Sequence, residues 1–157
     1  MFGIGGWTIS SRSVGGSNSS TPGTRVAMSD KVLVDTSAWI EFFRGTPSTC
    51  GDKVGELLRR DRTCVTGLII VELSRGAKGT RELRTLDELL RTVTSLEVSD
   101  DVYRKAGELS YRMARRGLTL GTVDAVIAAT AIRHDCPLLT LDDHFQQIRR
   151  FAPLHLA

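Results

Sequence analysis

The sequence has few cysteines and no long apolar run, and these two absences exclude several classes of protein. Its 157 residues include three cysteines, Cys50, Cys64 and Cys136, an odd number without a CxxC spacing. This pattern argues against a disulfide framework and against a cysteine-based zinc site, and it suits a reducing compartment. No apolar run approaches the ~20 residues of a membrane-spanning helix, and the N-terminal segment lacks the basic region of a signal peptide. We therefore expect a cytoplasmic protein without a membrane contact.

The sequence also has little excess charge. Its formal net charge is +3, and two of the 21 basic residues, Arg12 and Arg25, lie in a stretch without acids. From Met28 onward, 19 basic residues face 18 acidic ones. A domain that binds nucleic acid by overall charge usually carries more positive charge than this. A nucleic-acid substrate would therefore have to be held by a local basic patch and by metal ions.

The chain divides into a short extension and one domain. Residues 1–27 are rich in Gly, Ser and Thr, and they offer too little apolar surface to offset the entropy lost on ordering. We predict that they form a flexible N-terminal extension, and Met28 would serve as a natural first residue. Residues 28–157 are predicted to form a single folded domain.

In this domain, short apolar runs alternate with longer amphipathic ones. The short runs predict buried strands near residues 32–34, 64–66, 93–98 and 138–140, with a fifth strand at the edge near 154–156. The longer runs predict helices near residues 37–43, 52–60, 68–75, 80–92, 100–116, 122–134 and 144–150. Alternation of this kind is typical of an α/β protein. We expect a three-layer α/β/α sandwich with a parallel sheet of four to five strands.

Acidic residues stand where such a sheet binds its ligands. Asp35 follows the first predicted strand, Asp142 follows the fourth, and Asp124 lies in the first turn of a helix. Ligands of parallel sheets bind beyond the carboxyl ends of the strands, where helix N-termini converge. Glu72 differs, because it lies inside the apolar run of residues 68–73, which is an unusual place for a solvated surface glutamate. These four carboxylates are candidates for one shared site.

Each of these acids also has a structural explanation. Asp35 can cap the helix that follows it, Asp124 can interact with the helix dipole, and either Asp142 or Asp143 can cap the last helix. Together, however, carboxylates in one pocket would repel by about 4 kcal/mol per pair at 4 Å for an effective dielectric near 20. Such a cluster persists only if cations neutralise it or its pKa values rise. Ligands that are all oxygen favour Mg²⁺ or Mn²⁺ over zinc.

Four motifs resemble those of a known family. In chain order they are VLVDTSAWIEFFRG, VTGLIIVELSRGA, LTLGTVDAVIAATA and LLTLDDHF. Together they closely resemble the PIN-domain toxins of the VapC family, over about residues 31–150. The resemblance implies a Mg²⁺- or Mn²⁺-dependent endoribonuclease that cleaves RNA by metal-activated water, as the toxin of a type II toxin–antitoxin pair. It also implies a homodimer and a hetero-oligomer with a cognate VapB-like antitoxin.

The motifs also imply which residues form the site. By resemblance, the catalytic and metal-binding acids are Asp35, Glu72, Asp124 and Asp142. Thr36 and Ser37 stand where the family keeps small hydroxyl residues near the metal, and Thr140 would orient Asp142. The adjacent Asp143 leaves the fourth acid ambiguous. We prefer Asp142 because it completes the T-x-D segment that begins at Thr140.

Some assignments stay open at this point. The candidates for RNA binding are Arg112, Arg115 and Arg116, for which a solvated basic face is the alternative. The histidines receive no functional role; they are His134, His144 and His155. Two other functions remain as alternatives: a housekeeping RNA-processing nuclease of the same fold without an antitoxin, and a catalytically silent metal-binding interaction or signalling module.

Overall fold

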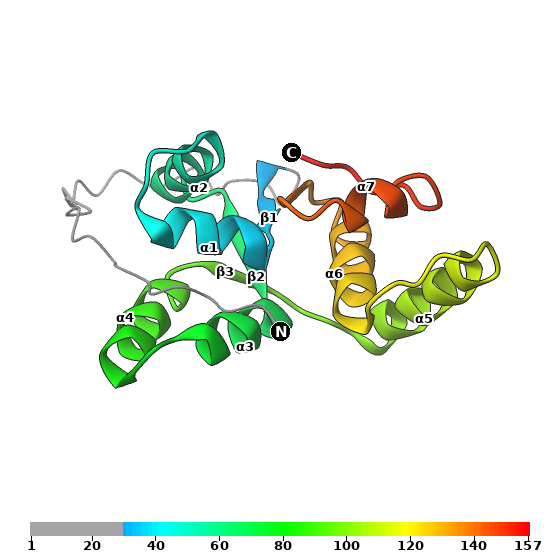
Figure 1. Ribbon diagram of the computed structural model, residues 1–157, viewed down its shortest axis with the longest axis horizontal. Coiled ribbons are helices and arrows are strands. Elements are labelled where there is room, and N and C mark those ends of the chain that lie inside the picture. Colours follow the sequence, from blue (N-terminus) through cyan, green and yellow to red (C-terminus); the bar gives the residue numbers. More distant parts are fainter. Residues whose placement is uncertain (1–29) are drawn as a thin grey trace.

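The computed structural model describes residues 30–157, and its central element is a four-stranded parallel sheet (Figure 1). The strands are β1 (Val32–Val34), β2 (Thr63–Thr66), β3 (Thr94–Leu96) and β4 (Leu138–Leu139), in the order β3-β2-β1-β4. Leu33 of β1 pairs with Cys64 on one side and with Leu138 on the other. The predicted fifth strand contributes only a parallel bridge between Leu156 and Leu138. The predicted extension and the start of the domain at Met28 lie outside the described residues.

Helices connect the strands as predicted. They are α1 (Thr36–Arg44), α2 (Thr49–Arg59), α3 (Gly67–Gly76), α4 (Thr80–Leu90), α5 (Asp100–Ala114), α6 (Thr122–Arg133) and α7 (His144–Ile148). The largest shift is at α2, which begins at Thr49 rather than Asp52. The side chain of Ser48 accepts a hydrogen bond from the Gly51 amide at 3.1 Å and so caps the helix earlier.

The strand order divides the helices into two layers. From β1 to β2 and on to β3, the chain advances in one direction through the sheet, and from β3 to β4 it returns to the opposite edge. Because crossovers between parallel strands are right-handed, α1–α4 must cover one face and α5–α6 the other. In Figure 1, α1–α4 lie on one side of the strands and α5–α7 on the other. This arrangement confirms the three-layer α/β/α sandwich.

The sheet is buried on both faces. Leu33, Val34 and Val65 have no solvent exposure, which explains why the strands appear in the sequence as continuous apolar runs. The thiols of Cys64 and Cys136 are free, and their Sγ atoms lie 3.5 Å apart in the core. Within residues 30–157, no helix has the length and apolar character needed to cross a bilayer.

The topology creates a switch point between β1 and β4. After β1 the chain continues to β2 and β3 on one side of β1, and it then returns from β3 to β4 on the other side of β1. The amide of Asp35 donates a hydrogen bond to the carbonyl of Leu139 at 2.9 Å, so the ends of β1 and β4 are held together. In open α/β sheets, ligands bind at this position, beyond the carboxyl ends of the strands.

Candidate active site

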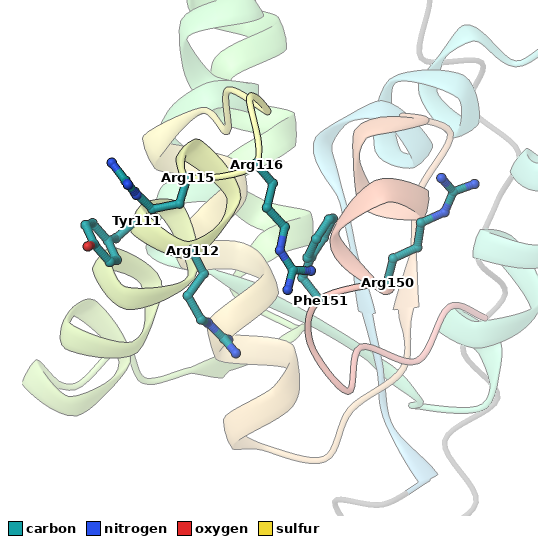
Figure 2. A pocket seen from close by; sticks show the side chains of 6 residues that line it. All are labelled: Tyr111, Arg112, Arg115, Arg116, Arg150 and Phe151. Carbon is teal, nitrogen blue, oxygen red and sulfur yellow. The ribbon is translucent and has the colours of Figure 1, made fainter.

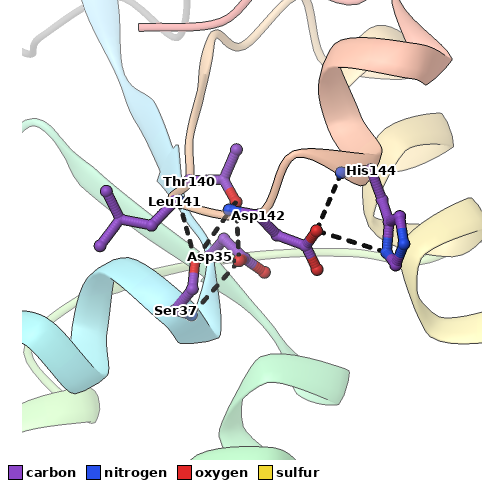
Figure 3. Close-up of polar contacts among 6 residues, drawn as sticks. All are labelled: Asp35, Ser37, Thr140, Leu141, Asp142 and His144. Carbon is purple, nitrogen blue, oxygen red and sulfur yellow. Dashed lines mark hydrogen bonds and ion pairs between the residues drawn. The ribbon is translucent and has the colours of Figure 1, made fainter.

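Asp35 lies at the carboxyl end of β1, and one of its oxygens is tightly held. Its side chain is buried, with 5% exposure. Oδ2 accepts hydrogen bonds from the Ser37 amide at 3.2 Å, the Ser37 hydroxyl at 2.6 Å and the Thr140 hydroxyl at 2.9 Å (Figure 3). No donor within residues 30–157 reaches Oδ1. Asp35 therefore does cap α1, as the structural explanation proposed, but it does so with Oδ2 alone, and Oδ1 has no donor within residues 30–157.

The loop after β4 is tied to Asp35 by two hydroxyls. Thr140 donates to Asp35, and its oxygen accepts the amide proton of Asp142 at 3.0 Å. The Ser37 hydroxyl accepts from the Leu141 amide at 2.9 Å. Thr140 was expected to orient Asp142, and its contact with that residue is a hydrogen bond from the Asp142 backbone amide. Because both hydroxyls also contact Asp35, the two aspartates are positioned as a unit.

Asp142 points to the cluster, whereas Asp143 does not take part in it. Oδ1 of Asp142 accepts a hydrogen bond from the His144 amide at 2.9 Å and lies 3.3 Å from the His144 Nδ1 atom (Figure 3). Ligand atoms of Asp124, Asp142 and His144 lie within 4.8 Å of one another. Asp143 is exposed and makes no side-chain capping bond to α7. This geometry favours Asp142 over Asp143 as the fourth acid.

His144 is the residue at this site that the sequence analysis missed. The sequence offered one signal, its position two residues after Asp142 at the start of a helix. In that position an aspartate side chain commonly accepts the amide of the second following residue. The turn that results also brings the imidazole to the same carboxylate.

Asp124 reaches the cluster from the opposite face of the sheet, in the first turn of α6. Burial raises the pKa of its carboxyl group, and the negative charges of Asp142, Asp35 and Glu72 raise the pKa further, against a smaller opposing influence of His144. The helix begins after Gly121, where a Cβ would lie 3.0 Å from Asp124 Oδ2. A glycine at this point leaves space for the carboxylate.

Glu72 enters the site from α3. Its Oε2 accepts a hydrogen bond of 2.6 Å from the hydroxyl of Thr36, the residue directly after Asp35. This bond orients the glutamate and connects α3 to the start of α1. The four predicted acids, Asp35, Glu72, Asp124 and Asp142, come from four separate segments, and the charges of the other three all act on Asp124. Within residues 30–157, the group whose ligand atoms all lie within 4.8 Å of one another is Asp124, Asp142 and His144; Asp35 and Glu72 are not part of it.

The donor set fits a divalent cation. Asp124 lies close enough to the other three carboxylates for their charges to raise its pKa, and the basic group that acts on Asp124 and pairs with Asp142 is the imidazole of His144. Charges of the same sign at this spacing are unfavourable unless a cation or protonation offsets them. Carboxylate oxygens are ligands that Mg²⁺ and Mn²⁺ accept, and Mn²⁺ also accepts imidazole.

The predicted RNA-binding arginines form a separate feature. Together with residues that the sequence analysis did not single out, they line a cavity of about 460 Å³ (Figure 2); the lining residues are Tyr111, Arg112, Arg115, Arg116, Arg150 and Phe151. Of the additional residues, Tyr111 lies in α5 itself, whereas Arg150 and Phe151 lie far along the chain, so sequence spacing gave no sign of them.

Known proteins are similar to this chain in sequence and in fold. The PIN domain model matches residues 32–151. Ribonuclease VapC11 from Mycobacterium tuberculosis is 37% identical over 130 residues, which cover 80% of this chain and 97% of that protein. Ribonuclease VapC19 from the same species is 32% identical over 125 residues, covering 77% and 97%. The crystal structure of VapBC2 from Rickettsia felis, bound to a DNA fragment from their promoter, has a TM-score of 0.67 at 20% identity and covers 80% of this chain and 96% of that chain.

Proposed function

The chain belongs to the PIN-domain family, in the branch of the VapC ribonucleases, and we propose that it cleaves RNA with the help of Mg²⁺ or Mn²⁺ as the toxin of a toxin–antitoxin pair. The observation that carries the proposal is the convergence of four carboxylates at the switch point of the sheet. They come from four segments, and within residues 30–157 the only basic group that pairs with them is His144. Such a cluster is hard to explain by helix capping alone.

The proposed ligands are the four acids, Asp35, Glu72, Asp124 and Asp142. When bound, a divalent cation lowers the pKa of a water ligand and offsets charge on the phosphodiester and on the leaving oxygen. Asp35 presents Oδ1 to the site, because Oδ2 is occupied by Ser37 and Thr140. Ser37 and Thr140 are positioning residues in this proposal.

The remaining acids are held by other contacts. Thr36 orients Glu72 through its 2.6 Å hydrogen bond. Partial burial of Asp124 in α6 limits solvent screening of its charge, which strengthens its attraction for a cation. His144 holds Asp142 through the backbone amide and lies close enough to add an imidazole nitrogen to the site.

The test of this proposal is cleavage of purified RNA. We expect the chain to cut total cellular RNA in the presence of Mg²⁺ or Mn²⁺ and to stop when EDTA is added. Asp35→Asn keeps the size and capping ability of the side chain but removes its charge. Loss of a residue that only supports a metal ligand typically lowers activity about 10- to 100-fold. Asp35→Asn should lower the cleavage rate by more than this. The matched control is Glu88→Gln, an exposed acid on α4, which should cleave like the wild type.

Two results would contradict the proposal. Wild-type cleavage by Asp35→Asn would remove that residue from the active site. Cleavage that is equally fast in EDTA would exclude the metal requirement.

The proposal includes a small VapB-like antitoxin as partner and a homodimer as the assembled form of the chain. Its support is the likeness to solved VapBC complexes, which include VapBC-1 from nontypeable Haemophilus influenzae at a TM-score of 0.65. The test is expression of the chain with and without the product of a neighbouring short reading frame. We expect growth arrest by the chain alone, rescue by the second protein, and co-purification of the two. Harmless expression of an active nuclease would instead favour a housekeeping role.

A further inference from the structure

Four arginines gather around one cavity beside α5. Tyr111, Arg112, Arg115 and Arg116 belong to the last turn of α5 and the turn that follows it, while Arg150 and Phe151 follow α7. The cavity has a volume of about 460 Å³. Figure 2 shows Arg116 extending from the α5 side toward Phe151, with its guanidinium 5.0 Å from the centre of the ring. This cation–π contact joins the two segments that form the cavity.

The positive charge in this cavity has no counterpart in the described chain. None of its four arginines forms an ion pair with another residue of 30–157, whereas Arg60 and Arg91 each pair with an acid one helical turn away at 2.8 Å. Four arginines without an acidic partner leave a positive charge on this surface that a bound anion would offset. A planar guanidinium matches the geometry of a phosphate group particularly well.

An aromatic side chain accompanies the arginines. Tyr111 is 66% exposed, although a side chain of this size usually gains stability by burial. Exposed aromatic rings next to basic groups are a common means of binding single-stranded nucleic acid, because every base can stack on a ring regardless of sequence. An acidic protein segment would pair with the arginines but would gain little from the exposed tyrosine.

The cavity is close to the carboxylate cluster along two segments of chain. The loop after Arg116 leads directly into α6, whose first turn holds Asp124. On the other side, α7 begins at His144, which contacts Asp142, and Arg150 follows at the end of the next turn. Arg150 comes six residues after His144, in the turn beyond α7, so their Cα atoms lie at most about 22 Å apart. A polymer held in the cavity is therefore within reach of the cluster.

We propose that this cavity binds the phosphate backbone of single-stranded RNA next to the phosphodiester that is cleaved, with the arginines on the phosphates and Tyr111 against a base. The identification of the polymer as RNA rests on the proposed function. The cavity supplies the local basic patch that a chain with nearly balanced charges needs in order to hold its substrate.

The experiment measures RNA affinity in a background that does not cleave. Asp35→Asn is combined with Arg112→Gln, Arg115→Gln and Arg150→Gln, which leaves the Arg116 contact with Phe151 intact. The probe is a fluorescein-labelled 12-nucleotide single-stranded RNA of mixed sequence, and its anisotropy is followed over a series of salt concentrations without divalent metal. The control combines Asp35→Asn with an equal loss of charge at exposed arginines that make no ion pair in the described chain: Arg59→Gln, Arg81→Gln and Arg84→Gln.

The cavity variant should bind the RNA more than about tenfold more weakly at moderate salt, and its log–log salt slope should fall by about 2, since each lost phosphate contact on a single strand removes about 0.7. The control should stay within about threefold of its parent. Melting curves that match the parent show that both variants are folded.

Several outcomes are decisive. Equal losses in the cavity variant and the control would overturn the proposal, since net charge alone would then explain binding. Unchanged RNA affinity together with lost binding of the antitoxin would also overturn it and would assign the cavity to the protein partner. Selective loss of RNA affinity supports the cavity even if the wild-type chain shows no metal-stimulated cleavage, a result that would contradict only the proposed function.

Discussion

Replacing Asp124 by asparagine should make the metal-free protein more stable. A ligand oxygen of Asp124 lies within 4.8 Å of one from Asp142, and two unit charges at this separation repel by about 3.5 kcal/mol for an effective dielectric of 20. The Asp142 side chain is 38% exposed, and solvent screening reduces the effect to about 1 kcal/mol. For a domain of this size, the gain corresponds to a melting temperature about 4 °C higher.

The dependence on pH has a definite sign. In the folded protein the pKa of Asp124 is raised by burial and by the neighbouring carboxylates. The folded state therefore holds its proton more firmly than the unfolded state, and stability falls as the pH rises through the interval between the two pKa values. The difference between wild type and Asp124→Asn should be full at neutral pH and should shrink as the pH falls toward the ordinary pKa of an aspartate.

A divalent cation should reverse the order of stability. A ligand present at 100 times its Kd stabilises the folded state by about 2.7 kcal/mol, and Asp124→Asn should lose most of this gain. Melting curves recorded by calorimetry or with a dye, first in EDTA and then in Mn²⁺, measure the stability of both proteins without metal and the stabilisation of each by metal. The exposed variant Glu88→Gln should follow the wild type under both conditions.

If Asp124 only interacts with the helix dipole, Asp124→Asn should lower the stability of the metal-free protein instead of raising it. If Asp124 serves only the dipole of α6, its neutralisation costs about 0.3–1 kcal/mol in EDTA, and Mn²⁺ stabilises both proteins equally. A variant that melts below the wild type in EDTA would therefore refute the argument from repulsion.

Two further substitutions test contacts elsewhere in the structure. Thr140→Val removes the hydroxyl that holds Asp35 and should weaken Mn²⁺ binding about 10- to 100-fold by calorimetric titration; unchanged affinity would show that the hydroxyl has no positioning role. Lys31→Met removes a buried ammonium group that donates to the Asp61 carbonyl at 2.7 Å and the Thr94 hydroxyl at 3.0 Å. The loss should lower the free energy of unfolding in urea by about 2 kcal/mol. An unchanged unfolding midpoint would mean that these hydrogen bonds contribute little to stability.

Much of the fold follows from local patterns in the sequence. The strands are short apolar runs because both faces of the sheet are covered, and their alternation with amphipathic segments leaves few alternatives to a parallel sheet. The C-terminal segment was less predictable. Apolar residues at 154 and 156 suggested a strand, but only Leu156 forms a bridge with β4, and the amide of Leu154 donates instead to the carbonyl of Ala152 at 2.8 Å.

The positions of the acids were predictable for a different reason. Asp35 and Asp142 follow strands whose carboxyl ends must lie at one edge, so topology alone brings them together. The sequence favoured Asp142 over Asp143 only through its place in the T-x-D segment, because the choice depends on which carboxylate the turn before α7 directs inward. The position of His144 at the site also depends on the geometry of this turn, and for that reason the sequence did not reveal it.

The site also shows why balanced charge is compatible with a polyanionic substrate. Its carboxylates are held by the neutral hydroxyls of Thr36, Ser37 and Thr140, each of which donates a hydrogen bond without neutralising the charge. An arginine in the same place would compete directly with a cation for the carboxylates. The arginines instead gather beside α5, where no acid pairs with them in the described chain. On the two proposals made above, segregation of the two signs, rather than net charge, lets a nearly neutral chain bind a metal at one place and phosphate groups at the next.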